Sequence, residues 1–264
     1  DISEKLNWEK YITIWTSWYR GKVRRFHNYY IYNGQRKVKM EKKSMQGAKK
    51  VAEDWADLLY NEKVSINLQK DADTKALNEI LRQNNAGVVI NQGVEKSFAI
   101  GTGALVVSVQ DIEQGENILD VTNAKIKLEF VECKKIVPLT WENGKIIECA
   151  FVTTKHKKGR TYIYIAMHVL NDKGNYVIKN YMFKGKYSSF VEANEEEKEG
   201  FIAEFDTLSN IPWFAIITPN ICNNIDNETP FGLSVYANAI DTLKCLDNAY
   251  DGLDNEVVIG RRRT

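Results

Sequence analysis

Asp120 and the triplet Glu132-Cys133-Lys134 are the residues whose types and spacing come nearest to a catalytic pattern. In metal-dependent nucleases two carboxylates hold Mg²⁺ and a lysine steadies the nucleophile, and an aspartate followed by Glu-x-Lys is the spacing of such sites. The pattern is loose, and it arises often by chance in a chain of which 27% is charged. A Mg²⁺-dependent nuclease-like enzyme is therefore an alternative hypothesis, which requires the three side chains to converge on one pocket.

Thiol and imidazole groups are too few and too scattered for a zinc site or a disulfide framework. The four cysteines contain no C-x-x-C pair, which predicts buried free thiols, and the three histidines have no partner at catalytic spacing. These residues are Cys133, Cys149, Cys222, Cys245, His27, His156 and His168. Gly101-Thr102-Gly103 lacks the lysine of a phosphate-binding loop. We expect neither a metal nor a cofactor.

The stretch from Arg20 to Lys50 is the basic part of the chain, with eleven basic residues and only Glu41 as an acid. It also contains four aromatic residues, which are Phe26, Tyr29, Tyr30 and Tyr32. Basic groups interleaved with stacking aromatics are typical of nucleic-acid-binding modules, which we keep as a second alternative. The whole chain has 36 basic and 35 acidic residues, so its surface as a whole is not adapted to nucleic acid. A solvated hairpin and helix face explains the stretch equally simply.

The segment from Phe231 to Gly260 is the acidic part, with five acids against one base. An apolar stripe recurs at steps of three and four, which predicts about 24 residues of continuous helix with Ser234 near its start, about 35 Å long. The stripe consists of Tyr236, Ile240, Leu243, Leu246, Tyr250, Leu253 and Val257. It needs a partner to cover it, either another subunit or its own domain. Asp247 and Asp254 lie at its edge, where basic groups of a neighbour could reach them.

The remaining elements predict an α+β fold with N-terminal helices, an antiparallel sheet and the long C-terminal helix. Helical periodicity covers residues 2–19, 44–61 with Ser44 as its N-cap, 71–83 and 87–100. Asn33-Gly34 predicts a tight hairpin turn within residues 29–39. Short β-branched and aromatic runs separated by turn residues predict strands at 104–109, 125–131, 146–154, 161–170, 176–183 and 211–219. Residues 192–199 read as a solvated loop and 220–230 as a linker.

Two features of the chain concern its context. It begins at Asp1 without methionine and stops just after the predicted C-terminal helix, so we expect it to be a piece of a longer protein. No run of about 20 apolar residues is present, so we expect no membrane association and synthesis in the cytosol.

Several blocks, in order along nearly the whole chain, resemble portal proteins of tailed phages that infect Gram-positive bacteria. The blocks are Trp15-Thr16-Ser17-Trp18-Tyr19-Arg20-Gly21 with His27 and Tyr29, the segment Lys50 to Lys63, Phe98-Ala99-Ile100-Gly101-Thr102-Gly103-Ala104, and Phe231-Gly232-Leu233-Ser234 followed by Asn238-Ala239-Ile240-Asp241, Leu246-Asp247, Tyr250-Asp251 and Glu256. The order and spacing of the blocks together carry the resemblance. The resemblance implies a structural protein rather than an enzyme.

In such proteins a ring of subunits, usually twelve, sits at one capsid vertex and DNA enters and leaves through it. The resemblance assigns residues 1–230 to a wing domain and 231–264 to the start of the stem helix. It implies as partners a terminase motor, capsid, scaffold and head–tail adaptor proteins, and double-stranded DNA passing through the channel. The virion is then the location, after assembly in the cytoplasm of an infected bacterium or expression from a prophage. The basic stretch could face an acidic surface of a neighbouring subunit or of the scaffold.

The stem assignment also gives the acidic helix a role, because acidic walls let DNA slide without binding its phosphates tightly. The same acids could instead lie at subunit contacts. The residues that we assign to the stem helix, the channel or a subunit contact are Asp241, Lys244, Asp247, Tyr250, Asp251, Asp254, Glu256, Arg261, Arg262 and Arg263.

Overall fold

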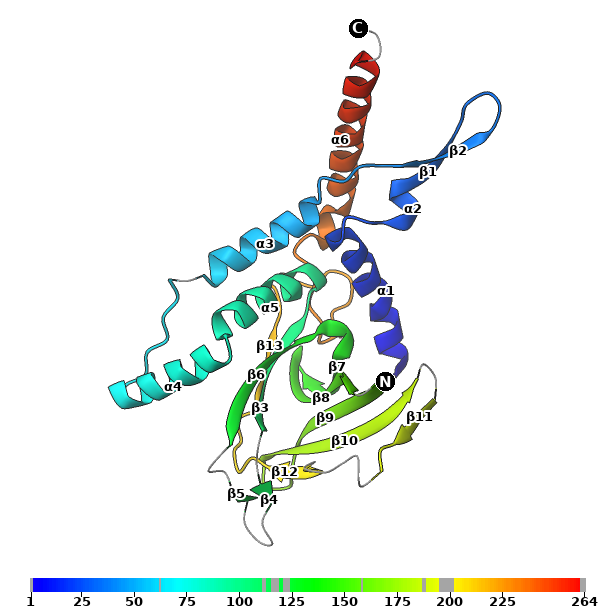
Figure 1. Cartoon of the computed structure of the whole chain (residues 1–264). Coiled ribbons are helices and arrows are strands. Elements are labelled where there is room, and N and C mark those ends of the chain that lie inside the picture. Colours follow the sequence, from blue (N-terminus) through cyan, green and yellow to red (C-terminus); the bar gives the residue numbers. More distant parts are fainter. Residues whose placement is uncertain are drawn as a thin grey trace.

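Helices lie above a set of antiparallel sheets, and the last helix projects from the body (Figure 1). The computed structural model describes residues 2–61, 63–110, 113–114, 119–120, 124–157, 159–186, 189–194 and 202–261. The helices are α1 (Ile2–Tyr19), α2 (Arg24–His27), α3 (Gly47–Leu59), α4 (Asp71–Gln83), α5 (Ala86–Ile100) and α6 (Ile240–Arg261), with short 3₁₀ helices η1 (Cys133–Lys135) and η3 (Ala237–Ala239). This mixture of helices and antiparallel strands is compatible with the predicted α+β class.

The strands form one large sheet and three small ones, all with antiparallel pairing. They are β1 (Asn28–Tyr32), β2 (Lys37–Glu41), β3 (Gly103–Gln110), β4 (Glu113–Gln114), β5 (Leu119–Asp120), β6 (Lys125–Glu132), β7 (Ile136–Glu142), β8 (Lys145–Lys157), β9 (Arg160–Leu170), β10 (Tyr176–Lys186), β11 (Ser189–Glu192), β12 (Glu204–Asp206) and β13 (Phe214–Ile217). The large sheet has the order β11-β10-β9-β8-β7 with β12 also on β10, and the second has the order β13-β3-β6. All six predicted strands of the sheet region are present.

Two local features of the large sheet are the turn between β7 and β8, which the sequence predicted, and strand β7, which it did not. Asn143 and Gly144 both have positive φ, 49° and 76°, as a two-residue hairpin turn between β7 and β8 requires. Strand β7 was not predicted, and it contains Pro138. Its position at the edge of the sheet order, with a register irregularity beside Pro138, is where a strand tolerates proline. The predicted loop at 192–199 lies largely outside the described residues.

The predicted hairpin is β1–β2, and its turn is longer than a two-residue turn. Tyr32 pairs with Lys37, which leaves Asn33 to Arg36 as the loop. Gly34 has a φ of 90°, and the side-chain oxygen of Asn33 accepts hydrogen bonds from the backbone N–H groups of Gln35 and Arg36. The asparagine therefore closes the turn with its side chain.

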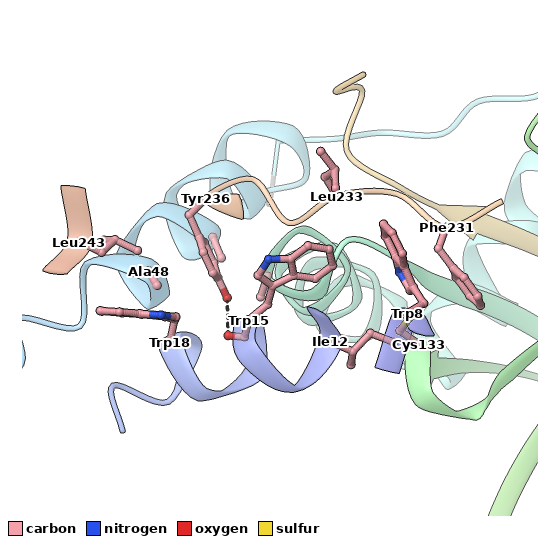
Figure 2. Close-up of a cluster of buried hydrophobic side chains, with 12 residues drawn as sticks. Trp8, Ile12, Trp15, Trp18, Ala48, Cys133, Phe231, Leu233, Tyr236 and Leu243 are labelled. Atoms are coloured by element: carbon pink, nitrogen blue, oxygen red, sulfur yellow. Dashed lines mark hydrogen bonds between the residues drawn. The ribbon is translucent and has the colours of Figure 1, made fainter. Parts of the chain in front are cut away.

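The helical layer has its own apolar core (Figure 2). The core consists of Trp8, Ile12, Trp15, Trp18, Ala48, Ala52, Ala99, Cys133, Phe231, Leu233, Tyr236 and Leu243. The α1 residues recur at steps of four and three, so they share one face. Alanines on α3 let its backbone approach that face closely. The hydroxyl of Tyr236 donates a hydrogen bond of 2.9 Å to the carbonyl oxygen of Trp15.

The segment Phe231 to Tyr236 crosses this core, and it corrects the predicted start of the last helix. We expected the helix to begin near Ser234, but α6 begins at Ile240 and has 22 residues. Ser234 is 2% exposed, and the N–H of Val235 donates to the carbonyl oxygen of Phe98 at the end of α5. Burial of the apolar side chains holds this segment outside the helix, because a helical path would carry them out of the core.

The segment Phe231 to Tyr236 passes beside Gly101-Thr102-Gly103, the residues at the junction of α5 and β3. Thr102 Oγ1 accepts a hydrogen bond of 2.9 Å from the N–H of Gly232. Gly101 has a φ of 92°, and a β-carbon there would lie 2.2 Å from the carbonyl oxygen of Gly232. Only glycine meets both the positive φ and the close backbone approach.

The predicted helix over 44–61 begins later than expected, because Ser44 is not its N-cap. Helix α3 starts at Gly47 after Gln46, whose φ is 54°. The hydroxyl of Ser44 instead accepts a hydrogen bond from the backbone N–H of Gln46. Met45, directly before Gln46, donates its N–H to Asp247 on α6, and this bond holds the segment out of the helix.

Substituting Gly101 with alanine should lower the free energy of unfolding by about 2–5 kcal/mol, the sum of a left-handed backbone penalty and overpacking. Gly252 on α6 is the matched control, since a β-carbon there meets no atom within 4 Å. Gly252→Ala should raise stability by up to about 1 kcal/mol, because alanine is the better helix former. Urea unfolding of both variants measures the difference. Equal stabilities would contradict the close contact at Gly101.

His168 in β9 should make stability depend on pH. It is 1% exposed between the rings of Phe151 and Phe214, and burial lowers its pKa to about 4. The unfolded state therefore takes up the proton near pH 6.5, and the folded state resists it. Stability should be complete above pH 6.5 and fall by about 3 kcal/mol as the pH drops to 4.

The pH dependence is measured by urea unfolding between pH 7 and pH 4. His168→Phe should flatten the curve over this range, while His156→Gln, at an exposed position, should leave it unchanged. A wild-type curve that His168→Phe does not alter would contradict the burial effect.

Candidate functional site: the projecting helix and its polar collar

Helix α6 is covered by its own chain at the start and uncovered toward its end. Leu243 is 8% exposed and belongs to the helical core, whereas Leu253 is 66% and Val257 47% exposed. The predicted apolar stripe is thus divided: packing on its own domain accounts for the first turns only. The outer part is an apolar strip without cover in the described residues.

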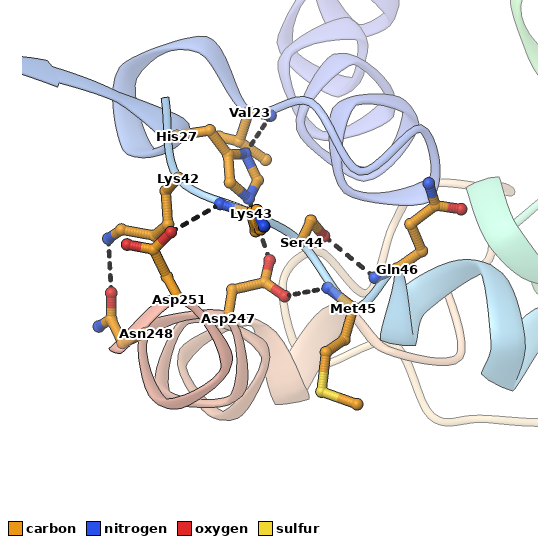
Figure 3. Close-up of polar contacts among 10 residues, drawn as sticks. All are labelled: Val23, His27, Lys42, Lys43, Ser44, Met45, Gln46, Asp247, Asn248 and Asp251. Atoms are coloured by element: carbon orange, nitrogen blue, oxygen red, sulfur yellow. Dashed lines mark hydrogen bonds and ion pairs between the residues drawn. The ribbon is translucent and has the colours of Figure 1, made fainter. Parts of the chain in front are cut away.

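Asp247 is the buried acid of this helix, and its partner is His27 on α2 (Figure 3). Its carboxylate accepts hydrogen bonds from His27 Nε2 at 3.0 Å and from the N–H of Met45 at 2.9 Å. His27 Nδ1 accepts from the N–H of Val23 at 2.8 Å, so the proton of a neutral ring sits on Nε2. Both residues are buried, at 3% and 2% exposure. The two groups satisfy each other inside the protein.

The segment from Lys42 to Met45 follows the same face of α6. The backbone N–H of Lys43 donates to the Asp251 carboxylate at 3.0 Å. The ammonium group of Lys43 lies 2.7 Å from the Asp254 carboxylate, and the hydrogen bond to Asp254 raises the pKa of Lys43. Lys42 Nζ donates to Asn248. Spacings of four and three residues place these α6 groups on one face. We call the following residues the collar: His27, Lys42, Lys43, Met45, Asp247, Asn248, Asp251 and Asp254.

The collar engages several of the residues that we assigned to stem, channel or subunit contacts. Asp247, Asp251 and Asp254 are bonded within their own chain, where we had expected basic groups of a neighbour to reach Asp247 and Asp254. Asp241 forms an exposed pair with Lys244 at 2.7 Å. Tyr250 is 39% exposed and Glu256 is exposed. Arg262, Arg263 and the side chain of Arg261 lie outside the described residues. The proposed role of this set stays a prediction.

His27 was missed by sequence reasoning, because its partner lies 220 residues away along the chain. The one available signal was Asp247 itself, an acid beside the apolar stripe of a helix. Such an acid needs either solvent or a buried partner.

The structure tests only part of the nuclease pattern, because it describes the side chains of Glu132 and Lys134 but not that of Asp120. Glu132 pairs with Lys96 at 3.7 Å, and Lys134 is exposed on η1. The backbone of Asp120 lies in β5, and its side chain is outside the described residues. Among the side chains that are described, no three His, Cys, Asp or Glu residues could hold a metal ion.

No disulfide joins the four cysteines, all of which are described. Cys133 and Cys149 are buried as expected, but Cys222 and Cys245 are exposed, so the prediction of buried thiols was wrong for these two. No helix among the described residues is both long and apolar enough to cross a membrane.

Asp247→Asn should lower the free energy of unfolding by about 1–3 kcal/mol, because the amide cannot accept from both His27 and Met45 as the carboxylate does. Asp241→Asn is the matched control on the same helix. The Asp241 side chain is 92% exposed, so loss of its surface pair should cost less than about 1 kcal/mol. Chemical denaturation measures both. If Asp247→Asn were no more harmful than Asp241→Asn, the collar would not anchor α6.

Comparison with known proteins bears on the whole chain. No protein with a curated description matches it. The family model for phage portal protein, SPP1 Gp6-like, matches residues 5–263. Because this match covers nearly the whole chain, the protein belongs to that family of phage portal proteins.

Proposed function

We propose that this chain is a subunit of the portal ring at a capsid vertex, through which phage DNA is packaged and ejected. Residues 1–230 act as the wing domain, and residues 231–264 carry the start of the stem. The ring contains twelve subunits in the full-length protein, and it works by shape and assembly rather than by bond chemistry. The family membership supports a structural role in the phage particle.

The observation that carries the proposal is the split burial of α6. A helix whose first turns are anchored by the core and the collar, and whose outer turns expose Leu253 and Val257, is suited to packing against another copy. Folded monomers rarely leave such an apolar strip in solvent. In a ring, equivalent helices of neighbouring copies lie close together, and each can cover part of the next.

The charge of α6 fits a position close to DNA. Its acids outnumber its bases by five to one between Ile240 and Gly260. A negative wall repels phosphates and prevents tight binding, so DNA can move along it. The acid Asp241 is exposed and available for this role, whereas Asp247 is occupied by the collar.

The remaining partners follow from the portal role. A separate terminase motor supplies the energy for packaging, and capsid, scaffold and head–tail adaptor proteins contact the outside of the ring. The protein is assembled in the cytoplasm of an infected bacterium, or is encoded by a prophage, and ends in the virion.

Light scattering of the full-length protein, together with negative-stain microscopy, should give the mass and outline of closed rings. Leu253→Asp should reduce ring formation, because a carboxylate in a buried apolar contact is costly. Leu208→Asp is the matched control, since Leu208 is 81% exposed and follows β12, a strand that lies far from α6 (Figure 1). A wild-type protein that stays monomeric at all concentrations and salt strengths would refute the portal proposal.

A further inference from the structure

The hairpin β1–β2 is an arm without a core of its own. Its register places Tyr30 beside Lys39 and Tyr32 beside Lys37, so the four side chains share one face. Tyr30 is 66% and Tyr32 69% exposed, and both lysines are exposed. A two-stranded hairpin is marginally stable by itself in water. Tyrosine-rich faces of this kind are typical of protein interfaces.

The arm is also the most basic projection of the chain. From Lys22 to Glu41 there are six basic residues and one acid. In the described part of the chain no ion pair involves Arg36, Lys37 or Lys39, in contrast to Lys43, Lys49 and Lys50, which bind acids nearby. The arm therefore carries uncompensated positive charge next to exposed aromatic rings.

A complementary surface lies on the outer half of α6. Glu256 follows Asp247 by nine residues, which is two and a half turns, so it points away from the collar. Leu253 is three residues before Glu256 and hence adjacent to it on the helix surface. Both are exposed. This surface places an apolar side chain beside an acid. It is complementary to the arm, where tyrosine rings lie beside lysines of opposite charge to that acid.

The arm cannot reach that surface in its own chain. Lys42 and Lys43, directly after β2, are bonded to the collar face of α6. From there the arm extends away from the helix (Figure 1). A contact between the arm and the opposite face of α6 must therefore join two copies, and two different surfaces that meet in this way generate a ring if the rotation closes. The lengths agree, because five strand residues span about 17 Å and the part of α6 beyond Asp247 about 21 Å.

We propose that the arm of one copy lies across the outer half of α6 in the neighbouring copy, with Tyr30 and Tyr32 on Leu253 and with Lys37 and Lys39 facing Glu256. This inference rests on the proposed ring. It assigns the partner of the basic stretch as a second copy of the chain rather than nucleic acid.

Cysteine cross-linking of full-length rings tests the contact. In a Cys222→Ser, Cys245→Ser background, Tyr32→Cys combined with Leu253→Cys should give an intersubunit ladder on non-reducing gels after mild oxidation. The matched control is Ile31→Cys with Leu253→Cys, because Ile31 is the next residue and points to the other face of the arm. The control should give no ladder.

Charge reversal provides a second readout that does not need a disulfide. Lys37→Glu with Lys39→Glu should cause loss of rings, and adding Glu256→Lys should restore them, since like charges across an interface disfavour it. The same variants are tested for binding to a fluorescent DNA duplex at low salt by anisotropy. Loss of DNA binding without any rescue by Glu256→Lys would overturn the proposal and assign the arm to nucleic acid.

The outcomes separate the two proposals. Wild-type rings with no ladder from the Tyr32 pair, or with equal ladders from both pairs, would overturn the arm contact and leave the portal function standing. Absence of rings from the wild-type protein would refute the portal function first. If a cysteine pair prevents ring formation, the charge-reversed variants decide the question. Rings restored by Glu256→Lys support the arm contact, and rings that stay absent overturn it.

Discussion

The burial of Phe231 to Tyr236 is the constraint on which the rest of the structure depends. These residues come from near the C-terminus, yet they complete a core that begins with Trp8 on α1. Phe231 stacks on Trp8 with ring centroids 6.4 Å apart, and Tyr236 bonds to Trp15. Without this segment the large indole rings of α1 would face solvent. The N-terminal and C-terminal parts of the chain therefore fold as one unit.

The same constraint fixes where α6 leaves the body. The backbone of Gly232 passes against Gly101, so the chain must emerge at the end of α5. A few residues later α6 begins, and the collar sets its direction. The buried hydrogen bonds to Asp247 fix the direction of α6 more firmly than surface ion pairs would. Leaving a buried polar group without its hydrogen bond costs more free energy than losing an exposed bond. The direction of the helix is thus set by groups on α2 and on the segment before α3.

A body with anchored first turns and an uncovered outer helix is suited to assembly. The described side chains do not gather carboxylates or thiols into a metal site. They do present two surfaces of opposite character, a basic aromatic arm and an acidic apolar helix. This division of charge is hidden in a net charge of +1, which is why whole-chain composition says little about the partners.

Local patterns in the sequence determined most of the secondary structure, the α+β class and the resemblance to portal proteins, because helical periodicity and turn residues act over a few positions. The limits of the helices over 2–19 and 71–83 agree with α1 and α4. The start of α6, the true start of α3 and the pairing of His27 with Asp247 were decided only by the tertiary structure. Each of them depends on contacts between residues far apart in the chain. A buried crossing segment prevented a helix directly after Ser234, and bonds from Lys42, Lys43 and Met45 to α6 kept the segment before Gly47 out of α3. Sequence spacing carries no record of such contacts, so the acids of α6 could be recognised as a set, but not divided into those that anchor the helix and those left for a partner.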